Sequence, residues 1–307
     1  ELDVERFGFN PRTYILPEES VSRAAWKSAL IFKPADSSRG EGITVMTRPW
    51  QLEKRRESLK SGEAVVQEYI AKPMLIDGYK WDLRVYVLIL SLEPLRVFFC
   101  REGLARLCSE PYAEPTVRTP LSCHLTNYSI TKCTTEYDHH DDPQDGSRGT
   151  KRTLSSAIAF LATLGLDTRS IWQQIRHIAA ATTEAMAFGC NDDDVAASRS
   201  CFQILGLDVI FDEQGKAWLL EVNACPSLEV DAVFPATGPY AEEPPDLPEG
   251  APHTSLMLAA KEAMGVKATH VCKCASHYRP HLHAPCAVDL TAKAACLSGA
   301  LEIVRRD

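Results

Sequence analysis

Two strand-like segments, FQILGLDVIF (202–211) and KAWLLEVN (216–223), are separated by only four residues, DEQG, which favours an antiparallel hairpin. A two- or four-residue turn pairs positions whose numbers sum to 427 and so places Asp208 opposite Leu219. Because side chains alternate along a strand, Asp208, Glu221 and Asn223 would then lie on one face.

Three oxygen-bearing side chains among apolar neighbours are costly on a sheet face unless something binds them. Carboxylate and amide oxygens suit a hard cation such as Mg²⁺, which completes its shell with water and phosphate oxygens. Alternatively, Glu221 pairs with a lysine and Asn223 caps the next turn. The hairpin alone leaves both interpretations open.

A second segment, WDLRVYVLIL (81–90), shows the same alternation. Lys80, Asp82 and Arg84 project from one face, and the intervening positions are apolar. A solvated sheet face is the usual cause of such a charged row, but the strongly apolar opposite face argues against a loose edge strand. Arg106, in GLARL, adds a further cation after the next strand.

The segment FKPADSSRGEGI combines a lysine with a glycine-containing loop between two strands. Gly40 and Gly42 would let backbone N–H groups approach a phosphate, and Lys33 would add a positive charge. This is not a Walker loop, because the lysine precedes the glycines and a strand follows. A plain hairpin loop is the alternative.

The remaining pattern predicts mixed strands and helices without regular βαβ alternation, which indicates an α+β fold. The other expected strands are LIFKP (30–34), GITVM (42–46), VVQEYI (65–70) and LRVFFC (95–100). The expected helices are 153–164, 168–188, 254–264 and 287–305, and the expected loops are 109–120, 138–151 and 235–252.

Composition excludes some classes of protein. The formal net charge of −8 disfavours general nucleic-acid binding, although an acidic substrate could still meet a local basic patch. No apolar run approaches the ~18–20 residues of a membrane span. Several of the eleven cysteines lie in apolar runs, so we expect buried free thiols in a reducing cytosol.

Together these segments resemble the tubulin tyrosine ligase-like family. The motifs that carry the resemblance, in the family's order, are FKPADSSRGEGI, VVQEYIAKPMLIDGYKWDLRVYVLI, REGLAR followed by SEPY, HLTNYSITK, and LGLDVIFDEQGKAWLLEVNACPS. The similarity runs from about residue 8 to residue 230, with a fainter match at VDLTAKAACLSGALEIV. One departure is NACPSL, where many members have a Ser-Pro-Ser-Phe run.

The resemblance implies an ATP-grasp fold with nucleotide held between two α+β lobes, here 1–74 and 75–307, and with the family's N-terminal lobe absent or reduced to 1–29. By motif match, the implied nucleotide-binding residues are Lys33, Gly40, Gly42, Gln67, Glu68, Tyr69, Lys80, Asp82, Thr126 and Asn127, with His124 also lining the site. The implied magnesium ligands are Asp208, Glu221 and Asn223, and the implied catalytic residues are Lys33, Arg84 and Arg106.

The implied activity is ATP-dependent addition of glutamate to glutamate side chains of tubulin tails, through an acylphosphate. ATP, Mg²⁺, microtubules and free glutamate are the expected ligands and partners, in the cytoplasm, on the cytoskeleton or in a cilium. A glycylase, a tyrosine ligase, a non-catalytic microtubule-binding relative and a ligase for small-molecule acceptors are the alternatives.

The segment CKCASHYRPHLHAPC places six cysteines and histidines within fifteen residues, a density compatible with zinc. They are Cys272, Cys274, His277, His281, His283 and Cys286. No standard finger has this spacing, so a loop with incidental cysteines and histidines is the favoured interpretation.

Overall fold

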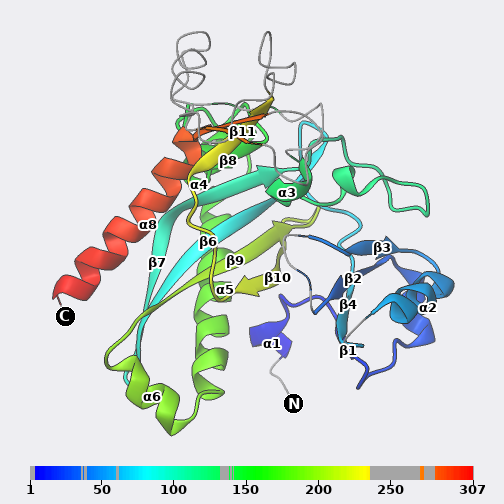
Figure 1. The fold of residues 1–307 in the computed structure, drawn as a ribbon, viewed down its shortest axis with the longest axis horizontal. Coiled ribbons are helices and arrows are strands. Elements are labelled where there is room, and N and C mark those ends of the chain that lie inside the picture. The colour runs from blue at the N-terminus through cyan, green and yellow to red at the C-terminus, as the bar shows by residue number, and fades with distance from the viewer. Residues whose placement is uncertain are drawn as a thin grey trace, which may run out of the picture.

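The computed structural model describes residues 4–35, 37, 40–59, 62–131, 138, 140, 142–235, 270–272 and 281–306. Antiparallel sheets and helices form the α+β architecture that the sequence predicts (Figure 1). No described helix is both long and apolar enough to cross a membrane. The cysteines with described side chains form no disulfide.

The N-terminal sheet has the order β1-β4-β2-β3, with all neighbours antiparallel. Its strands are β1 (Thr13–Leu16), β2 (Leu30–Pro34), β3 (Thr44–Met46) and β4 (Ala64–Glu68). Leu30 and Phe32 of β2 pack with Leu52 of α2 (Pro49–Ser58) in one core. Because side chains alternate, Ile31 and Lys33 lie on the opposite face.

The larger sheet has the order β10-β9-β6-β7-β8, with β5 paired to β6. Its strands are β5 (Leu75–Ile76), β6 (Tyr79–Leu92), β7 (Leu95–Leu107), β8 (Lys151–Thr153), β9 (Gln203–Phe211) and β10 (Ala217–Asn223). One face packs on α4 (Leu154–Thr163) and α5 (Thr168–Phe188) around Leu83, Val85 and Ile175 (Figure 1). The apolar positions between Lys80, Asp82 and Arg84 thus form the main core.

The other face carries the C-terminal helix α8 (Ala287–Arg306), which lies along β7 and β8 (Figure 1). Leu104 of β7 packs against Val288 and Ala292 of this helix. Leu104 is the register partner of Arg84 on β6, so α8 covers the continuation of the charged face. A small sheet of β11 (Asp231–Pro235), β13 (His281–Pro285) and β12 (His270–Cys272) lies beside it.

Short helices complete the described chain. They are α1 (Val4–Phe7), η1 (Arg23–Lys27), η2 (Leu121–Cys123), α3 (Tyr128–Thr131) and α6 (Asp192–Ser198). The sequence pattern predicted none of these, and it also missed α2 and the strands β1, β5, β8, β11, β12 and β13, because segments of two to ten residues show little periodicity. The predicted helix 254–264 and most of the loop 235–252 lie outside the described residues, and the boundary between residues 74 and 75 stays a prediction.

Candidate active site

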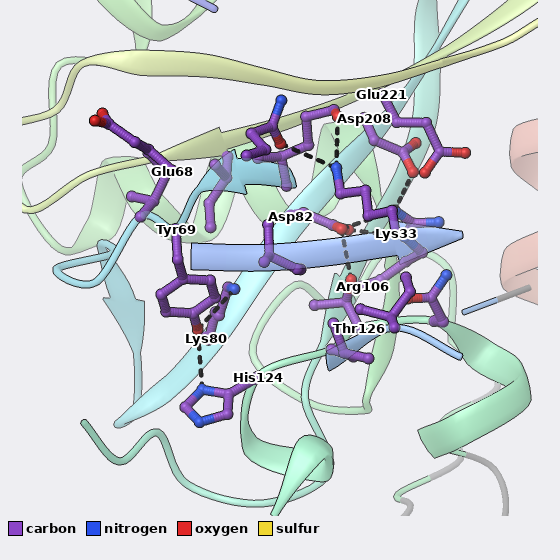
Figure 2. Close-up of a pocket in the computed structure, with 18 residues that line it drawn as sticks. Lys33, Glu68, Tyr69, Lys80, Asp82, Arg106, His124, Thr126, Asp208 and Glu221 are labelled. Carbon is purple, nitrogen blue, oxygen red and sulfur yellow. Dashed lines mark hydrogen bonds and ion pairs between the residues drawn. The ribbon is translucent and has the colours of Figure 1, made fainter. Parts of the chain in front are cut away.

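A pocket lies between the inner faces of the two larger sheets (Figure 2). Its apolar lining consists of Ile31, Ile43, Ile70, Leu125, Ile210 and Leu220. Its polar lining consists of Lys33, Gln67, Glu68, Tyr69, Lys80, Asp82, Arg106, His124, Thr126, Asn127, Asp208 and Glu221. A lining with both apolar and charged side chains suits a ligand with one apolar part and one charged part.

Strand alternation explains how β2 and β4 contribute to this pocket. Ile31 and Lys33 share the inner face of β2, and Gln67 of β4 is the register partner of Ile31. The Lys33 Nζ donates to Gln67 Oε1 and to the Leu220 carbonyl, both at 3.0 Å. Burial lowers the pKa of Lys33, and the carboxylates of Glu221 and Asp208 partly oppose that shift.

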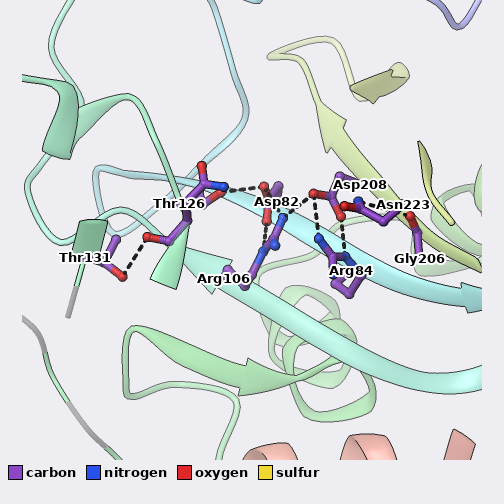
Figure 3. Close-up of polar contacts among 9 residues, drawn as sticks. Asp82, Arg84, Arg106, Thr126, Thr131, Gly206, Asp208 and Asn223 are labelled. Atoms are coloured by element: carbon purple, nitrogen blue, oxygen red, sulfur yellow. Dashed lines mark hydrogen bonds and ion pairs between the residues drawn. The ribbon is translucent and has the colours of Figure 1, made fainter. Parts of the chain in front are cut away.

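Two aspartates and two arginines form a continuous network on the large sheet (Figure 3). Arg106 donates two hydrogen bonds to Asp82, both of 2.8 Å, and a third of 2.9 Å to Asp208. Arg84 binds Asp208 through Nε at 2.5 Å and Nη2 at 3.0 Å. Thr126 donates to Asp82 at 2.5 Å. Such bidentate pairs hold their members rigidly and tolerate burial, because each charge meets an opposite one.

The same network sets the ionisation of Asp208. Burial alone would raise its pKa, but the charges of Arg106 and Arg84 together outweigh burial and hold the pKa below its ordinary value. Asp208 is therefore a carboxylate at neutral pH. The network combines two arginines with two aspartates, so its charges cancel before any ligand binds.

The hairpin register differs from the prediction. Leu219 pairs with Val209, not with Asp208, and packs in the main core. A β-bulge follows between Leu219 and Glu221, and it places Glu221 opposite Asp208. The predicted pairing was wrong, whereas the predicted common face of Asp208 and Glu221 is present, because the extra residue restores it.

The bulge also turns the Leu220 carbonyl to Lys33, as the hydrogen bond above shows. Asn223 pairs with Gly206 and donates its amide N–H to the Gly206 carbonyl at 3.3 Å, which leaves the amide oxygen for another partner (Figure 3). A Cβ at Gly206 would approach Arg84 Cδ within 2.9 Å, so only glycine lets the arginine lie across the strand.

These oxygens fit a hard cation. Partial withdrawal from water raises the pKa of Glu221, and the neighbouring charge of Asp208 raises it further. A divalent ion would relieve this like-charge contact and could take the Asn223 amide oxygen as a third ligand. Among the described residues, no three histidine, cysteine or acidic side chains are grouped so that they could hold a metal ion, so such a site would rest on two carboxylates, an amide and ligand oxygens.

A second lysine enters the pocket from β6. The Lys80 Nζ donates to the Tyr69 hydroxyl at 3.0 Å, and this hydroxyl lies 2.9 Å from His124 Nδ1 (Figure 2). All three side chains are buried. Two lysines thus reach the pocket from opposite sheets, as a polyanionic ligand requires.

Known proteins with similar sequences show which family this chain belongs to. Residues 2–235 match the sequence model of the Tubulin-tyrosine ligase family. This chain belongs to that family. The tubulin polyglutamylase TTLL11 of Homo sapiens is 38% identical over 248 residues, which cover 74% of this chain and 34% of the relative. The tubulin monoglutamylase TTLL4 of Mus musculus is 37% identical, covering 73% and 19% respectively.

Another similar relative is the tubulin polyglutamylase TTLL6 of Mus musculus, which is 36% identical and covers 74% of this chain and 28% of its own length. The chain therefore spans about a third or less of the length of these three relatives. The predicted resemblance to the tubulin tyrosine ligase-like proteins is confirmed.

Four predicted site residues of this family member lie just outside the pocket lining. Arg84 is ion-paired with Asp208 of the lining, and Asn223 donates to the carbonyl of Gly206, two positions before Asp208 on β9. Gly40, at a φ of 85°, comes so close to Asn127 that an added Cβ would lie 3.1 Å from its side chain. Gly42 has a φ of 72° and packs on Pro34. The glycine loop thus borders the site, and the roles of these residues stay predictions.

The sequence pattern missed the apolar lining of the pocket. Ile31 comes from the N-terminal sheet and Ile43 directly precedes its strand β3, whereas Ile210 and Leu220 come from the hairpin. Ile31 and Ile210 had a readable signal, because each lies two positions from a predicted site residue on its strand, Lys33 on β2 and Asp208 on β9. Leu220 had none, because its position depends on the bulge.

The zinc hypothesis gains no support. Cys274 and His277 lie outside the described residues, and the side chain of Cys272 is not among those described. Cys286 is 1% exposed and packs with Leu104 in an apolar cluster. A cysteine in such surroundings behaves as a small apolar residue.

Proposed function

We propose that this chain carries the catalytic site of an ATP-dependent ligase that adds glutamate to glutamate side chains of tubulin tails. Its family and the names of its relatives support this proposal. The observation that carries it is the neutral network of Arg84, Arg106, Asp82 and Asp208, flanked by Lys33 and Glu221 in one pocket.

The nucleotide would lie between the lobes 1–74 and 75–307. The apolar side chains of the lining would take the adenine along Glu68 and Tyr69, with Gln67 beside it. The Gly40–Gly42 loop would cover the phosphates, and Lys33 and Lys80 would bind them from opposite sides. Asp82, Thr126 and Asn127 would complete the wall beside the phosphates.

Magnesium, when bound, would neutralise the phosphate charge and link the phosphates to the protein. Asp208, Glu221 and Asn223 would hold this ion. Arg84 and Arg106 fix the orientation of Asp208, so its carboxylate would hold the ion without reorganising. Charge-balanced pairing also keeps the two guanidinium groups in place beside the reacting carboxylate.

The reaction would proceed in two steps. An acceptor carboxylate oxygen attacks the γ-phosphorus of ATP, the bond to ADP breaks, and an acylphosphate forms. The amine nitrogen of free glutamate then attacks the acyl carbon, phosphate leaves, and the amine loses a proton. Lys33, Arg84 and Arg106 would stabilise charge on the transferred phosphoryl group and the tetrahedral oxygen. No cysteine nucleophile is needed.

The substrate would be a tail of tubulin in microtubules, which places the protein on the cytoskeleton, in the cytoplasm or in a cilium. Because the whole chain has a net charge of −8, an acidic tail would be attracted only by local cations of the site. We infer that a cation near Arg84 or Arg106 pairs with the second carboxylate of the glutamate donor.

A competition assay tests the proposal. Unmodified microtubules are incubated with the protein, ATP, Mg²⁺ and equal concentrations of glutamate, glycine and tyrosine, and the tails are weighed by mass spectrometry. Glutamate should exceed glycine by roughly tenfold to a hundredfold, the worth of one charge-assisted hydrogen bond. Preference for glycine or tyrosine would refute the glutamylase, and no incorporation at all would refute the ligase.

A further inference from the structure

On one side of the pocket, one hydroxyl joins two buried basic groups. The Tyr69 Oη lies 3.0 Å from the Lys80 Nζ and 2.9 Å from His124 Nδ1 (Figure 2). The three residues are 6%, 5% and 2% exposed, respectively. They come from the segment after β4, from β6 and from the C-cap of η2, so no single element holds them together.

The proton positions follow from what each group can do. An ammonium only donates, so the Tyr69 oxygen must accept from Lys80. The Tyr69 hydroxyl can then donate its proton to His124 Nδ1 when this nitrogen is unprotonated. In that tautomer the imidazole proton resides on Nε2, and this nitrogen is buried without a hydrogen-bond partner among the described residues.

A buried N–H group without a partner destabilises the fold, and an apolar side chain of similar size would avoid it. The ring of His124 otherwise packs edge-on against Tyr69 and Tyr112, contacts that a leucine could replace. What a leucine could not supply is the acceptor at Nδ1.

We propose that His124, acting through the Tyr69 hydroxyl, positions the Lys80 ammonium toward the phosphates of the nucleotide. His124 is a positioning residue, since it reaches Lys80 only through Tyr69. This inference rests on the proposed ATP-dependent function of the pocket. Lys80 then differs from Lys33, which is held by the Gln67 amide and a backbone carbonyl.

The surroundings of Lys80 disfavour its charged form, which makes the hydrogen-bond acceptor on Tyr69 necessary. Burial lowers the pKa of Lys80 to about 8, Cys108, Asp82 and Cys123 oppose this shift, and Lys33 adds to it. Burial and then the charge of Lys80 lower the pKa of His124 to about 4, so its Nδ1 stays an acceptor at neutral pH. Removing the acceptor on Tyr69 would lower the pKa of Lys80 further, and its ammonium would be lost at a lower pH.

Three substitutions test the chain of contacts. Tyr69→Phe removes the hydroxyl, His124→Leu removes the acceptor, and His124→Asn keeps an acceptor oxygen near the Nδ1 position. Binding of a magnesium complex of a non-hydrolysable ATP analogue is measured by calorimetry from about pH 6 to about pH 9. We expect about tenfold weaker binding for the first two variants, with the alkaline loss of affinity shifted to lower pH. His124→Asn should bind within about threefold of the unchanged protein.

Tyr14→Phe is the matched control, because Tyr14 is as buried as Tyr69 but packs in the core of the N-terminal sheet, with its hydroxyl 3.3 Å from the Ser22 Oγ. It should leave both the affinity and the pH profile unchanged. If His124→Leu unfolds, Tyr69→Phe carries the test.

The inference is overturned if Tyr69→Phe and a folded His124→Leu show normal affinity and pH dependence, or if His124→Asn is as impaired as His124→Leu. Nitrogen NMR of ring-labelled histidine gives a readout independent of ligand: His124 should show a protonated Nε2 and a bare Nδ1, and the opposite tautomer contradicts the proposal. Normal nucleotide binding without ligation of any amino acid would refute the proposed function alone.

Discussion

The proposed magnesium site can be tested most directly by substituting Glu221. Replacing it by glutamine keeps size and hydrogen bonding but removes one charge from the pair with Asp208. Outer-shell changes at metal sites cost about 10–100-fold, so loss of a direct ligand should lower ligase activity by at least about a hundredfold. Activity is measured across a magnesium titration.

The stability of Glu221→Gln should change little. Because the pKa of Glu221 is raised in the folded protein, its ionised form opposes folding at neutral pH, and neutral glutamine should leave the free energy of unfolding unchanged or slightly higher. Partial exposure keeps any gain small. Glu213→Gln, at the exposed turn of the same hairpin, is the control and should keep full activity. Normal ligation by Glu221→Gln at limiting magnesium would exclude the metal role.

For single residues, the sequence predicted which side chains share a strand face, but not which residues they contact. Alternation on β6 placed Lys80 and Asp82 on one face, and the structure agrees. The contact of Tyr69 with His124 joins residues 55 positions apart, and no periodicity encodes it. Such pairings depend on how the sheets and connecting segments come together.

Among the elements, α8 is fixed to the large sheet by a buried ion triad. Asp289, 1% exposed, pairs with Lys293 on its own helix at 2.8 Å and with Lys151 of β8. Lys293 also donates to the Glu229 carbonyl, and Lys151 lies 4.1 Å from the ring centre of Tyr128 in α3. The triad thus connects α8 with the segment after β10 and, through Lys151, with α3, which follow Asn223 and Asn127 in the chain.

Asp289→Asn should lower the free energy of unfolding by about 3 kcal/mol at neutral pH, because two lysines lose their only carboxylate partner in the triad. Burial would raise the pKa of Asp289, but the two lysines together hold it below its ordinary value. Its contribution is therefore complete above the ordinary pKa of about 4 and is lost as the pH falls through the lower, folded-state value. Chemical denaturation from pH 7 downwards should show the difference between the two proteins shrinking below about pH 4.

Glu302→Gln is the control for this measurement. Glu302 pairs with Arg306 in the same helix at 3.3 Å, but both side chains are more than 70% exposed. An exposed pair contributes at most about 1 kcal/mol, so this variant should unfold like the unchanged protein. Equal effects of both substitutions would show that the triad does not hold α8.

The hairpin of β9 and β10 shows which features of an element the sequence could predict and which it could not. Its two strands and its turn follow from composition, and the shared acidic face is correct. The bulge at Leu220 could not be predicted, because it adds a residue without leaving a signal in the pattern of apolar and polar positions. The correct face was reached through a wrong pairing of Asp208 with Leu219.

For the whole molecule, the ordered motifs were enough to predict the α+β fold and the family, because all of them except HLTNYSITK contribute strands to a sheet. The relative placement of the sheets was accessible only through the resemblance. Lys33 and Glu221, which lie 188 positions apart in the chain, line one pocket only because the sheets face each other.

The last prediction concerns how both sheets respond to nucleotide. A ligand that binds only the folded state at 100 times its dissociation constant stabilises it by about 2.7 kcal/mol. If the nucleotide lies between the sheets, hydrogen exchange with a magnesium–ATP analogue should slow in β2 and β4 as well as in β6 and β9. The exposed end of α5 near Phe188, which is 94% exposed, serves as the internal control and should exchange as before. Protection confined to one sheet would exclude binding between them, and Glu221→Gln should remove the magnesium-dependent part of the effect.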